Sequence, residues 1–386
     1  MKKLMILGAA TLGLPAICAA QSSVTLYGIV DATVSYTTNQ GGGHNVQLLD
    51  GGPALSRWGL RGSEDLGNGL KAIFTLENGF NPANGTLSQD SREFGRQAFV
   101  GLSSNTYGTL KAGRMYDSIT NYVGSFGAAQ STIGSMSGHP GDVDDLVGSY
   151  RINNSVSYTT PDMLGFSASA MGSLGGQPGA AGTDSSYSFG LGYGHGPFKA
   201  GFAYGSYNRP NTSLWDGSAT AVGTLLFSAP VFSGYASATS LKIAGMGVGY
   251  DNGAAGVNVI YTNYRLTGLG SDGGPNPLHF NGGTAAFNTL ELNGRYFVTP
   301  TFMIAGAYQF TDGASTGGHD NQRYSQFSTI FDYFLSKRTD VYVSAAYEIA
   351  GGTSSLGTPA VAAINTVTPS RSDRQALVRL GIREKF

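Results

Sequence analysis

Apolar and polar side chains alternate along this chain with a period of two residues. In residues 24–36 the apolar side chains stand mainly at even positions and the polar ones at odd positions. Residues 301–310, 339–349 and 374–386 alternate in the same way. Successive side chains of a strand point to opposite faces, so each segment predicts a strand with one apolar and one polar face. Each is about ten residues long, which is the length that a tilted strand needs to cross a bilayer.

The connections between these segments alternate in length. Short turns are expected near residues 65–69, 105–108, 161–165, 195–198, 251–255, 299–301 and 336–339. Longer stretches rich in Gly, Ser and Asn are expected as loops near 37–54, 81–93, 119–149, 175–184, 209–233, 268–283, 312–320 and 351–370. These connections join sixteen strands, and an even number of strands puts both chain ends on the side of the short turns.

Composition narrows the fold class to a membrane barrel. Charged residues make up 12% of the chain, about half of the roughly 25% that is usual for soluble proteins. A large soluble all-β protein would also alternate, but it would explain neither the low charge nor the rhythm of long and short connections. We therefore predict a transmembrane sixteen-stranded antiparallel β-barrel with short periplasmic turns and long extracellular loops.

The first twenty residues are typical of a secretory signal peptide. Lys2 and Lys3 precede an apolar run that ends at Ile17, and small residues follow up to Ala20. Cleavage there would remove the only cysteine, Cys18, and leave residues 21–386 as a single barrel domain. The mature chain would then hold 21 basic residues (23 less Lys2 and Lys3) against 24 acidic ones, which gives no reason to expect nucleic-acid binding.

Several ordered stretches resemble the trimeric general porins of Gram-negative outer membranes, in particular the beta-proteobacterial and neisserial type. They are SVTLYGIVDA at 23–32, SRWGLRGSEDLGNGLKAIFTLE at 56–77, RQAFVGL at 96–102, YGTLKAGR at 107–114 and the terminal GIREKF. The resemblance implies a homotrimer in the outer membrane, in contact with lipid and lipopolysaccharide, with one water-filled pore in each subunit. It also implies that the third long loop, 119–149, folds into the barrel and narrows it.

The same resemblance supplies candidates for a basic pore wall. Arg57, Arg96 and Arg151 match positions at which the family places arginines opposite the third loop. Arg57 and Arg61 lie on the strand face opposite the apolar Trp58 and Leu60, so both point away from the apolar face. A charge that faced lipid at mid-membrane would cost roughly 2–4 kcal/mol. Arg114 is a further candidate. The alternative is that these arginines form ordinary salt bridges along the wall.

Acidic candidates face these arginines. The family sets acidic residues on the inserted loop, and Asp142, Asp144 and Asp145 are the only acids in 119–149. They cluster late in the loop, so the alternatives of a position at the pore mouth or in a solvated patch stay open. Glu77 and Asp31 have the parity of the lumen and would partly offset the arginines.

No bond-making chemistry is indicated. All five histidines fall in expected loops or turns, where surface roles are the ordinary expectation. No metal-binding spacing, phosphate-binding motif or hydrolase motif is present, so we expect no cofactor, no metal and no enzymatic activity. A barrel enzyme would need a histidine with acidic or serine partners on strands at one rim.

The prediction is therefore a passive outer-membrane diffusion channel for ions and small hydrophilic solutes. The alternative is a substrate-selective channel for sugars or a particular anion, and the charges leave the sign of any preference open. The terminal Phe386 shares parity with Leu380 and Ile382, which makes it an outward-facing anchor on the strand that closes the barrel. In the family, a terminal aromatic residue is also part of the signal that the barrel-assembly machinery reads.

Overall fold

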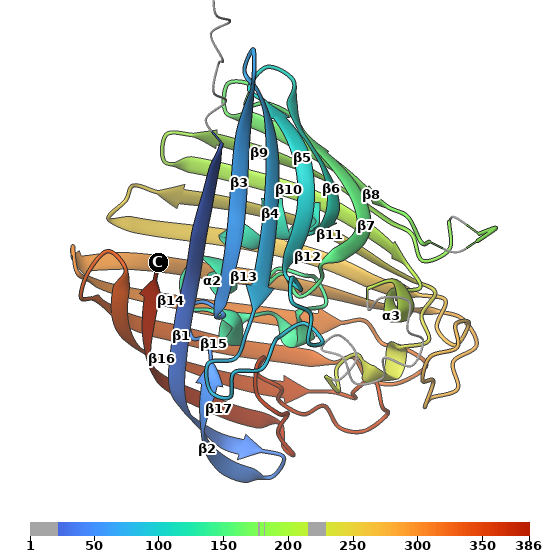
Figure 1. Cartoon of the computed structure of the whole chain (residues 1–386). Helices are drawn as coiled ribbons and strands as arrows, with labels where there is room; N and C mark the ends of the chain where they lie inside the picture. Colours follow the sequence, from blue (N-terminus) through green and yellow to red (C-terminus); the bar gives the residue numbers. More distant parts are fainter. Residues whose placement is uncertain (1–21, 177, 181, 215–228) are drawn as a thin grey trace, which may run out of the picture.

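The computed structural model describes residues 22–176, 178–180, 182–214 and 229–386, so the expected signal peptide lies outside the described residues. One continuous antiparallel sheet holds all the strands and closes into a barrel (Figure 1). The strands are β1 (Ser23–Gln40), β2 (Gly43–Asp50), β3 (Arg57–Gly67), β4 (Leu70–Gly79), β5 (Gln97–Ser104), β6 (Gly108–Met115), β7 (Ile152–Thr159), β8 (Phe166–Ser173), β9 (Ser186–His195), β10 (Phe198–Asn208), β11 (Ser240–Asp251), β12 (Ala255–Thr267), β13 (Thr284–Thr299), β14 (Phe302–Gly313), β15 (Arg323–Phe334), β16 (Thr339–Gly351) and β17 (Arg374–Lys385).

β2 and β3 are two parts of one barrel strand. Both pair with β1 on the same edge: Ala32 lies opposite Asp50 of β2, and Ile29 lies opposite Arg57 of β3. The interruption between them spans residues 51–56. Counted in this way, the barrel has the sixteen strands that the sequence predicts.

The barrel closes where the two ends of the chain meet. β17 pairs with β1 from Ile29 opposite Lys385 to Thr37 opposite Leu377. Beyond this ladder, Gly28 and Phe386 exchange two backbone hydrogen bonds of 3.0 Å each. The ring of Phe386 packs over Gly28, where a Cβ atom would collide with it. Every lateral edge of the sheet is therefore paired, as a bilayer requires.

Long and short connections alternate as expected. β3–β4, β5–β6, β9–β10 and β11–β12 are joined by turns of a few residues, whereas 80–96, 116–151 and 209–239 are long. One expectation is wrong in part. Residues 37–50, predicted as loop, continue β1 and β2 as a hairpin that turns at Gly41 and Gly42, because their alternation persists beyond the span used for the prediction.

The two faces of the barrel wall differ as the alternation predicts. On β17, Val378, Leu380 and Ile382 are exposed on the outside, while Arg379 and Arg383 are buried on the inside. Such outward apolar side chains recur on most strands and form an apolar outer surface. Among the described residues, no helix is long and apolar enough to cross a membrane.

The third long loop runs from residue 116 to residue 151 and lies inside the barrel (Figure 1). It is built from short helical turns: α1 (Ser118–Tyr122), η1 (Gly124–Phe126), α2 (Ala128–Ser131), η2 (Ser135–Ser137) and η3 (Pro140–Asp142). Outside this loop, α3 (Pro210–Ser213) and η4 (Ser233–Tyr235) lie in the connection between β10 and β11.

Candidate functional site

The third loop is fastened to one side of the barrel wall by inward polar side chains. The amide nitrogens of Asn293, Gln309 and Gln326 donate to backbone carbonyls of the loop at 2.9–3.0 Å. These amides stand on β13, β14 and β15 at positions that alternate with outward apolar residues. The loop therefore occupies one side of the lumen and leaves the other side open.

Glycines on the inner face of β9, β10 and β11 make room for the first half of the loop. A side chain at Gly201 would collide with the backbone of Tyr122, and one at Gly247 would press on the ring of Phe126. Val123 packs against Gly245 in the same way and is fully buried. The apolar side of α1 and η1 thus fits directly against the wall.

A charged cluster fixes the second half of the loop. His139 lies between two carboxylates: its Nδ1 is 2.5 Å from Oδ2 of Asp144, and its Nε2 is 2.9 Å from Oε2 of Glu291 on β13. Both ring nitrogens face acceptors, so the ring is an imidazolium that donates twice. Burial alone would lower the pKa of His139, but Asp144 and Glu291 outweigh burial and raise it to about 10.

The three loop carboxylates do not line the pore, which corrects the expectation for them. Asp142 is 4% exposed, and Asp144 and Asp145 are fully buried. Asp142 accepts hydrogen bonds from the backbone of Val147 and Ser149. Asp145 accepts them from Thr120 and Tyr150. Asp144 accepts them from His139 and from Thr262 on β12. Burial and the neighbouring Asp144 raise the pKa of Asp142 to about 7. Their late position in the loop reflects its return to the wall.

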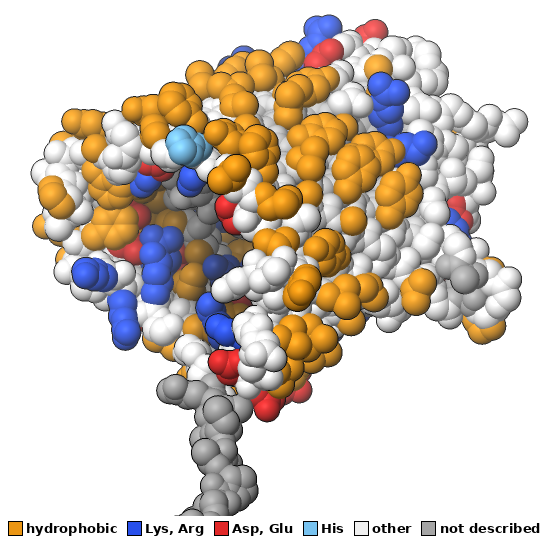
Figure 2. Space-filling view, turned by 90° about the horizontal axis from the view of Figure 1, so that it is seen from above, with side chains coloured by type: hydrophobic (Ala, Val, Ile, Leu, Met, Phe, Trp, Pro, Cys, Tyr) orange, Lys and Arg blue, Asp and Glu red, His pale blue; other side chains and the backbone are white. Residues whose placement is uncertain are grey.

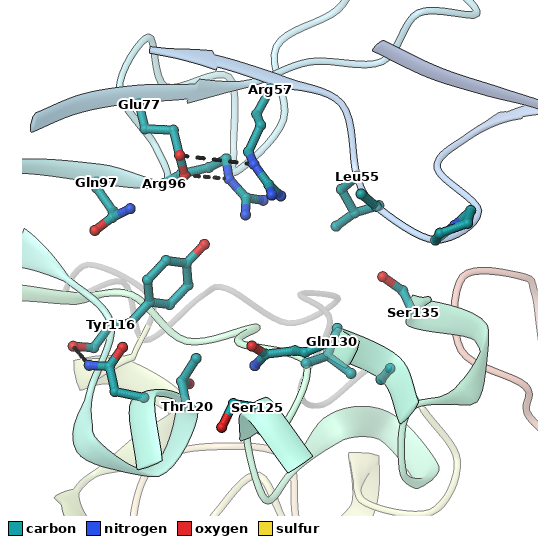
Figure 3. A pocket seen from close by; sticks show the side chains of 15 residues that line it. Leu55, Arg57, Glu77, Arg96, Gln97, Tyr116, Thr120, Ser125, Gln130 and Ser135 are labelled. Carbon is teal, nitrogen blue, oxygen red and sulfur yellow. Dashed lines mark hydrogen bonds and ion pairs between the residues drawn. The ribbon is translucent and has the colours of Figure 1, made fainter. Parts of the chain in front are cut away.

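A cavity of about 360 Å³ separates the loop from the opposite wall (Figure 3), and we call it the eyelet. Its wall side carries Arg57, Glu77 and Arg96, and its loop side carries Asn121, Ser125 and Gln130. The residues that line the eyelet on the loop side are uncharged; the full lining is Pro53, Ala54, Leu55, Arg57, Glu77, Arg96, Gln97, Tyr116, Thr120, Asn121, Ser125, Ala129, Gln130, Ser135 and Val147.

One carboxylate orients both wall arginines. Nε of Arg96 donates to Oε1 of Glu77 at 2.8 Å, and Nε of Arg57 is 4.0 Å from Oε2. The hydroxyl of Tyr27 donates to the same Oε2 at 2.9 Å. Glu77 thus faces the Nε atoms of Arg96 and Arg57 and balances one of the two positive charges of these arginines. Within the described part of the chain, the terminal amino groups of both arginines have no hydrogen-bond partner.

The other three arginines lie outside the eyelet. Arg151 faces the third loop but does not line the eyelet, because its guanidinium stacks on Tyr116, 5.2 Å from the ring centre, and donates to the carbonyl of Ser149. Arg114 donates to the carbonyls of Gly95 and Arg151 and so ties β6 to the ends of the two neighbouring long loops. Arg61 lies over the ring of Tyr27, at 4.1 Å, and lines a neighbouring cavity towards the short turns.

Residues 51–56, which interrupt the second barrel strand, form another border of the eyelet. Asp31 holds this segment: its carbonyl accepts from Gly51, and its carboxylate accepts from the backbone of Ala54 at 3.2 Å. Asp31 is fully buried beneath the segment, so it faces inward as parity predicts but does not contact the pore. This corrects its expected role as a charge that offsets the arginines in the pore.

The end of the barrel that carries the short turns is also basic. Figure 2 shows a hollow in this face, with Lys and Arg side chains gathered inside it and at its rim. Cavities of about 490 and 500 Å³ lie here. Arg61 and Lys385 line the first, and Lys111 and Lys199 the second together with Asp162.

No cluster of three or more His, Cys, Asp or Glu side chains in the described part of the chain could hold a metal ion. In the cluster around His139, the two carboxylates lie on opposite nitrogens of one ring and do not converge.

Sequence reasoning missed two parts of this site. His139 was expected at the surface and is instead 1% exposed, and Glu291, its partner on β13, was not singled out. A usable signal was present, because Glu291 stands between Leu290 and Leu292 and so has inward parity on β13. The inturned 51–56 segment carried a signal in the consecutive Gly51, Gly52 and Pro53, which suit a break in a strand.

Comparison with known proteins agrees with this architecture. The sequence profile of Gram-negative porins matches residues 7–350. An outer membrane porin protein of Bordetella pertussis is 30% identical over 394 aligned residues, which cover 90% of this chain and 94% of that protein. An anion-selective porin from Comamonas acidovorans shares the fold with a TM-score of 0.72 and 23% identity, covering 95% of this chain and all of that one. A trimer form of OmpT, an outer membrane protein of Vibrio cholerae, shares the fold with a TM-score of 0.61 and 14% identity. The match covers 95% of this chain and 99% of that one. The chain belongs to the family of Gram-negative porins, which are β-barrel channels of the outer membrane and not enzymes.

Proposed function

We propose that this porin is a passive diffusion channel for ions and small hydrophilic solutes, and that its eyelet favours anions. The observation that carries the sign of this preference is the asymmetry of the eyelet. Among the described residues that line the eyelet, Arg57 and Arg96 stand on one side with Glu77 as the acid that offsets them, and the opposite loop presents uncharged groups.

A few charges at a narrow point outweigh the net charge of the whole chain. A low-dielectric wall focuses the field of charges that border a constriction. The loop carboxylates that would counter the arginines are buried in contacts of their own, so they contribute little to the field in the eyelet. Lys111, Lys199 and Arg61 extend the positive field towards the short turns.

Two comparisons support the proposal. The porin from Comamonas acidovorans, which has the same fold, is described as anion-selective. A trimer form exists for the outer membrane protein of Vibrio cholerae. We extend both properties to this chain and propose a homotrimer of pores that prefer anions. We further propose that residues 1–20 are cleaved on export and that the barrel-assembly machinery inserts the barrel. The folded trimer would then contact lipid and lipopolysaccharide.

The preference can be tested by removing the two eyelet arginines together. Arg57→Ser with Arg96→Ser leaves Glu77 as the remaining charge of the wall and should shift the pore towards cations. The anion-to-cation permeability ratio should fall at least about fivefold, since one unit charge about 4 Å from an ion contributes roughly 1 kcal/mol even in bulk water. The measurement is the reversal potential of single pores in a planar bilayer under a salt gradient.

The matched control removes two arginines outside the pore. Arg323 and Arg374 are exposed at strand positions with outward parity. Arg323→Ser with Arg374→Ser changes the net charge equally and should leave the reversal potential in place. An equal shift in both double variants would show that overall charge governs selectivity, and an unchanged potential in the first would remove Arg57 and Arg96 from the selective step.

A further inference from the structure

The eyelet has an apolar border directly beside its arginines. Pro53, Ala54 and Leu55 line the cavity, and Leu55 is partly exposed to it. Figure 3 shows Leu55 on the same side of the cavity as Arg57 and Arg96, facing Gln130 and Ser135 of the loop. A general pore for hydrated ions gains nothing from an apolar side chain at its narrowest part, because such a surface holds no hydration shell in place.

The apolar border is held rigidly. Asp31 binds the segment through Gly51 and Ala54. Ser56 accepts the backbone N–H of Asp31 and donates its own N–H to Asp50, both at 2.9 Å. Arg379, fully buried, donates to the carbonyl of Gly51 at 2.8 Å. A surface fixed from several directions is preorganised and loses little entropy when a ligand contacts it.

The third loop presses on the same segment from the other side. A Cβ atom on Gly134 would collide with the carbonyl of Gly52, so the two backbones are in close contact. Gly134 has a φ of 99°, a conformation that favours glycine. The position of Leu55 relative to the loop is thus set by direct backbone packing.

The cationic border offers free donors next to this surface. Glu77 occupies the Nε side of Arg96 and approaches that of Arg57, and the terminal amino groups border the cavity. A guanidinium presents paired N–H groups that match the two oxygens of a carboxylate. Arg57, with 28% of its side chain exposed, is the more accessible of the two.

We propose that the eyelet is a binding site for small amphipathic carboxylates, that is, organic anions with one carboxylate and an apolar body such as an aromatic ring. The carboxylate binds the amino ends of Arg57 and Arg96, and the apolar body lies against Leu55 and Ala54. The volume of about 360 Å³ is near the lower end of the roughly 300–1,000 Å³ that small-molecule sites span, so it suits a ligand of one ring. The proposal rests on the anion preference proposed above and adds a solute class to it.

Other solute classes satisfy only part of this lining. An inorganic anion gains the arginines but leaves Leu55 without a partner. A neutral aromatic molecule gains Leu55 but leaves the guanidinium groups unpaired. A neutral sugar would need more hydrogen-bonding groups than the apolar border supplies.

The test is block of chloride current through single pores by sodium benzoate. Benzoate, acetate and benzyl alcohol are compared in the same bilayer at fixed KCl concentration. Benzoate should reduce the current at a concentration about tenfold lower than acetate, because covering roughly half of a phenyl ring has about that effect on affinity. Benzyl alcohol, which has the ring without the charge, should not block in this range.

A variant separates the apolar contribution from the charge. Leu55→Ser should remove most of the difference between benzoate and acetate and leave the reversal potential in a KCl gradient unchanged. Leu356→Ser is the matched control, since Leu356 is 40% exposed in a loop and lines none of the described cavities. Leu356→Ser should keep the full difference between the blocking concentrations of benzoate and acetate.

The outcomes distinguish this inference from the proposed function. A pore that prefers anions but is blocked equally by benzoate and acetate overturns the carboxylate site and leaves the channel function intact. A reversal potential that shows no anion preference overturns the proposed function itself. The comparison of the three probes in the native protein decides the matter even where Leu55→Ser fails to fold.

Discussion

At the scale of single residues, His139 forms the ionic link between the third loop and the wall. It joins Asp144 on the loop to Glu291 on the wall, and all three are nearly or fully buried. A buried charged group is stable only when its partners remain, and removing one partner of a buried pair costs about 3–5 kcal/mol. The loop thus depends on one ring for its ionic attachment to β13.

His139→Leu should destabilise the protein by about 3 kcal/mol or more, because it leaves two buried carboxylates without a cation. Equilibrium unfolding by guanidinium chloride in micelles measures this change. His44→Leu is the control, since His44 is exposed in the β1–β2 hairpin and should change stability by less than about 0.5 kcal/mol. Similar losses in both variants would contradict the role of His139.

The same residue predicts a dependence on pH. The pKa of His139 is about 10 in the folded protein, above the value of about 6.5 for an unperturbed histidine. A raised pKa means that the stabilisation is complete below about pH 6.5 and is lost as the pH rises towards 10. The unfolding temperature of the native protein should therefore fall between these pH values. The unfolding temperature of His139→Leu should change less over the same range. Thermal unfolding monitored by circular dichroism measures both.

At the scale of elements, the seam between β1 and β17 completes the barrel. Phe386 contributes the last two backbone hydrogen bonds of the seam and covers Gly28 with its ring. Its side chain is 47% exposed and borders the cavity that Arg61 and Lys385 line at the end of the short turns. A terminal residue with these contacts belongs to the folded barrel.

Deletion of Phe386 should therefore reduce the yield of folded barrel, because the seam loses two hydrogen bonds and Gly28 loses its cover. The measurement is the heat-dependent shift in gel mobility that separates folded from unfolded barrels. Phe386→Tyr keeps the backbone and the ring and should fold normally. Full yield after the deletion would contradict the role of this residue in closure or assembly.

The alternation of apolar and polar residues predicts the strands of the barrel wall well. It predicts loop 116–151 and segment 51–56, which lie inside the barrel, poorly. The inward and outward sets of β1, β14, β16 and β17 follow directly from parity. Loop 116–151 and segment 51–56 have no such period, and their positions depend on contacts with distant strands. Asp144 and Asp31 have the residue type of pore-lining charges, but partners far away in the sequence, Thr262 for Asp144 and Ala54 for Asp31, accompany their burial.

At the scale of the whole molecule, the barrel combines a closed wall with a filled side and an open side. The third loop packs on β9 to β15, and the eyelet remains between it and the part of the wall where Arg57 begins β3 and Arg96 precedes β5. The fold and the family could be predicted from the sequence. The sign of the charge in the eyelet could not, since it depends on which carboxylates are buried.

We propose that this barrel is an open pore that prefers anions. The most direct test is the reversal potential of the purified native protein in a planar bilayer under a KCl gradient. Anion preference carries chloride down the gradient, so the dilute compartment should become negative, with a conductance that rises in proportion to salt concentration. A positive dilute compartment would show a preference for cations, and a folded barrel that carries no current would show that the pore is not open.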